Sequence, residues 1–130
     1  MNIKLTILNS FFFISLITVL LFNSFLTEYD IAGLYLYLVI VTIPLFILQF
    51  ISISIFSSRI KKKEPNIFFK ACKRPNGSQG SSINVAALFD ESIPFSKMKE
   101  QYLIRDWNFT KRVVIYSMLS FIILIILFFI

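Results

Sequence analysis

The chain has 130 residues, of which 57% are hydrophobic and 15% are charged, and its mean hydropathy is +0.79. A typical soluble domain is about 45–50% apolar and about 25% charged, so this composition excludes an ordinary water-soluble fold and favours an integral membrane protein. The net charge of +6 is concentrated in one segment between two apolar stretches, which is typical of membrane orientation and argues against nucleic-acid binding.

Residues that usually carry enzyme chemistry are scarce. The chain has no histidine and one cysteine, Cys72, which excludes imidazole general bases, Ser–His pairs, intrachain disulfides and cysteine-based zinc clusters. We therefore expect no enzyme activity, no catalytic residue, no metal site and no cofactor. Basic neighbours of Cys72 would lower the pKa of its thiol, so a reactive or acylated thiol is the alternative to an incidental reduced one.

The first apolar stretch covers about residues 5–26 and contains no charge. A helix rises about 1.5 Å per residue, so about 20 residues cross a hydrocarbon core of about 30 Å. Lys4 before the stretch also fits a secretory signal peptide, but the stretch exceeds a usual signal core and lacks an Ala-x-Ala-like cleavage site, which favours an uncleaved anchor. The short acidic turn that follows, with Glu28 and Asp30, joins only adjacent antiparallel helices and predicts a helical hairpin.

The second span covers about residues 31–56 and carries polar side chains inside an apolar sequence. Pro44 lies mid-span and predicts a kink. Tyr35, Thr42 and Gln49 are seven residues apart and share one face of an α-helix, with Ser52 near it one turn later. A glutamine amide facing lipid costs a few kcal/mol, so this intramembrane polar face is expected to meet another helix or, alternatively, to line a transport path.

A basic loop of about residues 57–111 follows. Pro65 follows a cluster of basic residues at the start of this loop: Arg59, Lys61, Lys62 and Lys63. We expect this cluster to contact anionic lipid or, alternatively, only to fix the orientation of the chain in the membrane. The Gly/Ser-rich stretch 75–82 predicts a flexible turn or a disordered link.

The end of this loop favours helix. Good helix formers predict one from Phe95 to Phe109, and an interfacial position of that helix would place Trp107 near the lipid headgroups.

The third span covers about residues 112–130, so the sequence predicts an all-α integral membrane protein with three transmembrane helices, 1–130 forming a single membrane domain. All Lys and Arg residues except Lys4 lie from Arg59 to Arg112, in the basic loop and at the start of the third span, and the 27–30 turn has none. Cytoplasmic loops carry the Lys/Arg excess. We therefore expect a multi-pass protein of the plasma (inner) membrane, with its N-terminus and basic loop cytoplasmic and its C-terminus on the opposite side.

Three functions are compatible with these features. The leading one is a small non-enzymatic protein acting by interaction in the lipid bilayer, as an accessory subunit or a regulatory or immunity-type factor, with a membrane-protein partner or a second copy. The alternative is a self-associating pore or transport component lined by Tyr35, Thr42 and Gln49. The third is a membrane-surface lipid enzyme, which would use carboxylates of the basic loop: Asp90, Glu91, Glu100 and Asp106.

Overall fold

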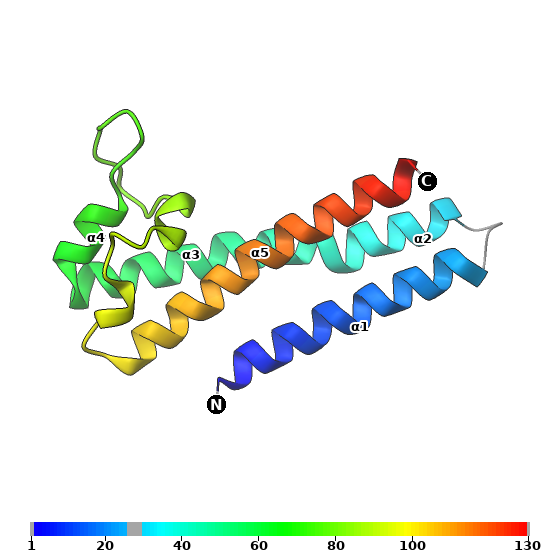
Figure 1. Cartoon of the computed structure of the whole chain (residues 1–130), viewed down its shortest axis with the longest axis horizontal. Coiled ribbons are helices and arrows are strands. Elements are labelled where there is room, and N and C mark those ends of the chain that lie inside the picture. Colours follow the sequence, from blue (N-terminus) through cyan, green and yellow to red (C-terminus); the bar gives the residue numbers. More distant parts are fainter. Residues whose placement is uncertain (1, 26–29, 130) are drawn as a thin grey trace. The chain divides into compact units, whose positions relative to one another are not determined.

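The computed structural model of the chain describes residues 2–25 and 30–129, and every regular element in this part is a helix (Figure 1). The all-α expectation is confirmed for these residues, while most of the acidic turn lies outside them. In chain order the elements are α1 (Ile3–Phe25), α2 (Asp30–Tyr37), the π-helical η2 (Leu38–Thr42), α3 (Ile43–Lys63), α4 (Pro65–Ala71), the 3-10 helices η3 (Val85–Phe89) and η4 (Phe95–Lys97), and α5 (Gln101–Phe129).

Three helical stretches are long and apolar enough to cross a membrane: Ile3–Phe22, Ile31–Lys63 and Gln101–Phe129. They coincide with the three apolar stretches of the sequence. Their outward surfaces carry large apolar side chains, of which Ile14, Phe50 and Phe128 are examples. Monomeric soluble proteins rarely expose apolar surface this extensive, so these faces are suited to contact with lipid or with other apolar helices.

The chain divides into two compact units. We call Met1–Leu48 together with Val113–Ile130 the apolar unit, and Gln49–Arg112 the basic unit. The basic unit contains every Lys and Arg of the chain except Lys4.

In the apolar unit, α1 and α2 lie side by side, as predicted for a helical hairpin (Figure 1). The close approach depends on Gly33, where an added Cβ would lie 2.7 Å from Cδ1 of Phe22. Small residues at such positions let helix backbones approach closely, which strengthens packing where water supplies no hydrophobic driving force. The buried face of α1 is apolar and includes Leu8, Phe12 and Val19.

The basic unit is folded around its own apolar core. Pro65 ends α3, because the residue before a proline is driven out of the helical region, and Glu64 has φ −134° and ψ 67°. After this break α4 and the segments that follow it bury apolar side chains almost completely, among them Ala71, Leu88, Phe95 and Leu103.

The helix limits in the basic unit differ from those predicted. The second helix does not end near residue 56 but continues through the basic cluster to Lys63, and α5 begins at Gln101 and runs unbroken to Phe129. The helix predicted from Phe95 to Phe109 therefore forms only from Gln101 onward, as the first part of α5. Only the 3-10 turn η4 forms at Phe95, and the chain is extended at Met98 before α5 begins.

The Gly/Ser-rich stretch has a defined backbone. The N–H of Arg74 donates to the carbonyl of Ser78 at 2.9 Å, and Lys73 pairs with Gln79 in an isolated antiparallel bridge. Gly77 at the tip has φ +85°, a conformation that glycine adopts without steric cost. The stretch forms a tight turn, which is one of the two predicted alternatives, rather than a disordered link.

Candidate functional site

The helix of the second span is π-helical immediately before Pro44. The N–H of Ile43 donates to the carbonyl of Leu38, five residues earlier, and η2 occupies Leu38–Thr42. A proline removes one helical N–H and its ring crowds the carbonyl one turn before it, and a π turn relieves that crowding by widening the helix. The perturbation that the sequence predicts as a kink at Pro44 takes this form.

The π turn changes which side chains share the polar face. Tyr35 is 64% exposed, whereas Thr42 is 3% exposed and Gln49 and Ser52 are each 7% exposed. A π turn holds more residues than an α turn, so the seven-residue spacing no longer keeps Tyr35 in line with Thr42. Tyr37, which is buried and five residues before Thr42, takes the place expected for Tyr35.

Two hydroxyl groups of this region are buried without a bond. Among the residues that the structure describes, neither the hydroxyl of Tyr37 nor Oγ1 of Thr42 has a hydrogen-bond partner. Gln49 differs, because its side chain takes part in an interaction within the protein. Buried hydroxyls without partners cost stability and are uncommon in native proteins, so this pair lowers the stability of the second helix at the π turn.

A polar contact that sequence reasoning missed joins α1 to α5 in the apolar unit. The hydroxyl of Tyr116 donates to Oδ1 of Asn9 at 2.6 Å, and its ring stacks on Phe12 with centroids 4.1 Å apart. The signal in the sequence is Asn9 itself, an amide inside a charge-free apolar stretch. Its partner lies 107 residues away, and no local pattern points to it.

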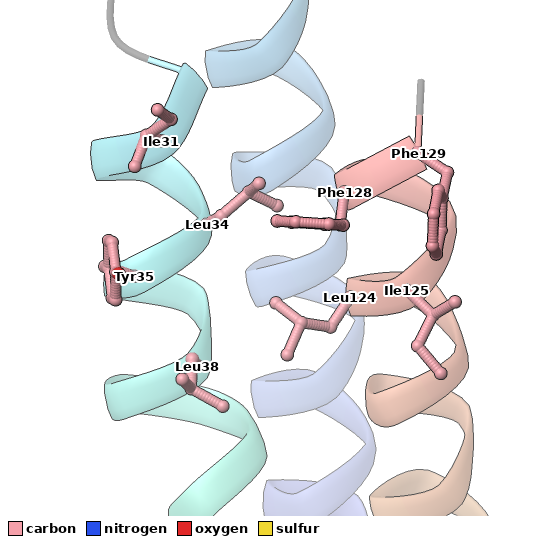
Figure 2. A pocket seen from close by; sticks show the side chains of 8 residues that line it. All are labelled: Ile31, Leu34, Tyr35, Leu38, Leu124, Ile125, Phe128 and Phe129. Carbon is pink, nitrogen blue, oxygen red and sulfur yellow. The ribbon is translucent and has the colours of Figure 1, made fainter.

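An apolar groove of about 470 Å³ lies between α2 and the last turns of α5 (Figure 2). Leu34 on α2 and Phe128 on α5 project toward each other across it, and Tyr35 contributes to its wall (Figure 2). The lining offers no charge and one hydroxyl, that of Tyr35, so it has almost no means of orienting a polar ligand. The groove fits a hydrocarbon surface, whether lipid or helix.

The side chains of the basic cluster at the end of α3 have different surroundings. Arg59 forms an ion pair with Asp106 of α5 and lies 6.0 Å from the ring of Tyr102. Lys62 and Lys63 are exposed in the last turn of α3, where cations interact favourably with the helix dipole. Lys61 lines a cavity.

That cavity, which we call the serine pocket, has a volume of about 440 Å³. It lies between α3, α4 and the loop before η3. Five serines and one lysine form its polar lining: Ser54, Ser57, Ser58, Ser81, Ser82 and Lys61. Three side chains form its apolar lining: Phe50, Ile53 and Phe68. No carboxylate lines it, so its chemistry is that of hydroxyl donors beside a cation.

Trp107 is part of the packing of the basic unit. Its Nε1 donates to the carbonyl of Leu88 at 3.0 Å, and its ring stacks on Phe95 with centroids 5.5 Å apart. The ammonium of Lys111 lies 4.3 Å from the centroid of the indole. The indole N–H, which an interfacial tryptophan would offer to headgroups, is thus used inside the protein.

The carboxylates proposed for a lipid enzyme are not gathered in one place. Asp106 is paired with Arg59, while Asp90 accepts hydrogen bonds from the side chain and backbone of Ser92, which hold the pKa of Asp90 below its usual range. Within residues 2–25 and 30–129 no three His, Cys, Asp or Glu side chains lie close enough to hold a metal ion.

Cys72 is 1% exposed, and burial raises the pKa of its thiol while nearby Lys61 partly opposes this. A buried neutral thiol is a poor nucleophile, so the basic neighbours that suggested a reactive cysteine do not produce one.

Comparison of the chain with protein-family models, with curated proteins and with solved structures found no match.

Proposed function

We propose that the chain is an integral membrane protein that spans the bilayer three times and acts without catalysis, by interaction, with the basic unit on the cytoplasmic side. The observation that supports this most is the burial of the polar side chains of the second helix, Thr42, Gln49 and Ser52, beneath surfaces that are apolar outside. A pore built by self-association needs polar side chains on an outward face, where they can line a lumen.

The basic unit supplies the recognition surface in this proposal. It has a packed core, and cationic side chains are exposed on it, including Lys70, Lys73 and Lys97. Electrostatic complementarity gives specificity and speeds association, so the partner proposed is an acidic segment of another membrane-associated protein. The apolar helices keep the chain in the bilayer beside that partner.

Site-specific photocrosslinking in native membranes tests this function. A photoreactive residue at Ser96, which is exposed in the basic unit, is expected to give one discrete adduct, and Lys97→Glu together with Lys73→Glu is expected to abolish it. The same probe at Ile14, exposed on α1, is the control and should give an adduct that those two substitutions leave unchanged.

The competing pore function predicts a different result. Purified chain in liposomes would then conduct ions, and Gln49→Leu would reduce the conductance. Conductance of this kind, without a charge-dependent adduct at Ser96, would overturn the interaction proposal.

A further inference from the structure

The hydroxyls of the serine pocket are available to a ligand. Ser54, Ser57 and Ser58 lie three and four residues apart and so share one face of α3. Elsewhere in the protein helical hydroxyls donate back to a carbonyl of their own helix, as Ser15 does to Phe11 at 2.6 Å and Ser117 does to Val114 at 2.9 Å.

Within the described chain none of the three serines on this face makes such a bond. Ser57 is 7% exposed, and its Oγ accepts from the N–H of Ile83 at 3.4 Å, which leaves its own hydrogen to donate. The pocket therefore has a buried hydroxyl held in place by the backbone, with further hydroxyls around it.

Lys61 supplies the positive charge. No carboxylate of the described chain pairs with it, and its ammonium lies 6.0 Å from the centroid of the Phe68 ring. Lys61 follows Ser57 and Ser58 by four and three residues on α3, so it shares their helix face and lines the same pocket. Hydroxyl donors beside an unpaired ammonium form the ordinary recognition set for a phosphate group.

The depth of the pocket indicates the source of that phosphate. The helical stretch Ile31–Lys63 has 33 residues and is about 50 Å long, whereas the hydrocarbon core is about 30 Å thick. About 20 residues from Ile31 bring the chain to Phe50, so Phe50 and Ile53 lie where the core ends and the serines lie in the headgroup layer. The pocket is apolar toward the acyl chains and polar toward the headgroups.

We propose that the serine pocket binds the phosphate headgroup of an anionic phospholipid, with Lys61 and the serine hydroxyls on the phosphate and Phe50 and Ile53 against the glycerol end of the acyl chains. The depth argument rests on the membrane insertion proposed above, whereas the binding chemistry does not depend on a protein partner. A bound lipid would hold α3, α4 and the loop before η3 in one arrangement.

Native mass spectrometry of the full chain in detergent micelles tests this inference with phosphatidylglycerol and phosphatidylcholine as probes. We expect a one-to-one phosphatidylglycerol adduct that Lys61→Ala weakens about tenfold, the usual effect of losing a hydrogen bond to a charged group. Lys62→Ala removes the same charge from a neighbouring exposed position outside the pocket, so it tests general attraction between charges and should weaken the adduct clearly less than Lys61→Ala does.

A second pair of variants separates filling of the pocket from loss of charge. Ser54→Trp should block the pocket with all charges retained and remove the adduct, while Ile55→Trp, on the same helix but outside the lining, should not. Circular dichroism checks that all four variants keep the helix content of the parent chain.

Three results would overturn the inference. One is an equal loss with Lys61→Ala and Lys62→Ala, which would indicate diffuse attraction between charges. Another is equal binding of phosphatidylcholine. The third is binding of glycerol 3-phosphate or inorganic phosphate without binding of the lipid, which would assign the pocket to a soluble phosphate. Crosslinking at Ser96 is unaffected by any of these results, so failure here is distinguishable from failure of the proposed function.

Discussion

Two buried tyrosine hydroxyls of this protein differ in whether they form a hydrogen bond. Tyr116 and Tyr37 are both buried on helices of the apolar unit, yet the hydroxyl of Tyr116 bonds to Asn9 and the hydroxyl of Tyr37 has no partner within the described chain. The two tyrosines therefore form a matched pair for substitution, because Tyr→Phe removes the same atom at both positions.

Tyr116→Phe is expected to lower the free energy of unfolding by about 0.5–1.5 kcal/mol, the range for interhelical hydrogen bonds in membranes. Tyr37→Phe removes a hydroxyl that is buried without a partner, so it should leave that free energy unchanged or raise it slightly. Unfolding in mixed detergent micelles at increasing dodecyl sulfate measures both. A larger loss for Tyr37→Phe than for Tyr116→Phe would mean that a bound molecule satisfies the Tyr37 hydroxyl.

The thiol of Cys72 is expected to be unreactive in the folded chain. Burial raises its pKa, so little thiolate is present at neutral pH, and the side chain is almost inaccessible. Because the folded state favours the neutral thiol, this contribution to stability is complete below the unfolded pKa of about 8.5 and is lost as pH rises toward the folded pKa.

Maleimide labelling at pH 7 checks the expectation for Cys72. The folded chain should react much more slowly than the chain in denaturant, whereas Ser96→Cys in a Cys72→Ala background should react at similar rates in both states. Rapid labelling of Cys72 in the folded chain would restore a reactive thiol as a functional candidate.

At the scale of elements, the basic unit has an aromatic core that no periodic pattern of the sequence predicts. Phe95 lies 5.8 Å from Phe56 and 5.5 Å from Trp107, measured between ring centroids, and joins α3 to α5 within this unit. The sequence-based prediction places Phe95 on one helix with Phe109, but the extended backbone at Met98 separates Phe95 from α5.

Phe95→Ala should therefore lower the free energy of unfolding by about 3–5 kcal/mol through loss of burial and creation of a cavity. Phe69→Ala is the matched control, since Phe69 is 63% exposed and its loss should change that free energy by less than about 0.5 kcal/mol. Hydrogen exchange of backbone amides should localise the Phe95→Ala effect to Gln49–Arg112. Equal protection of this unit in the two variants would contradict the assigned core.

In the second helix, α-helical periodicity predicts the buried face correctly after the π turn but not before it. Thr42, Gln49 and Ser52 keep the α-helical spacing and are all buried, as a shared face predicts. Tyr35 does not, because the π turn between it and Thr42 adds residues that a strict α-helical count omits. Pro44 predicts that the helix is perturbed, but the sequence around Pro44 does not indicate whether the helix bends or forms a π turn.

At the scale of the whole chain, the features that follow from local composition could be predicted, and those that depend on distant contacts could not. Charge-free length alone locates the three long apolar helices. The bond between Tyr116 and Asn9 and the serine pocket require residues far apart in sequence to meet, and single-chain periodicity carries no such information.

The central claim is that the three long helices span a membrane and place the basic unit on the cytoplasmic side, and cysteine accessibility tests it most directly. In a Cys72→Ala background, Ser96→Cys reports on the basic unit and Thr27→Cys on the short acidic turn. A membrane-impermeant maleimide should label Thr27→Cys in intact cells and Ser96→Cys only in inside-out vesicles. Labelling of Ser96→Cys in intact cells, or of both positions from the same side, would contradict the account.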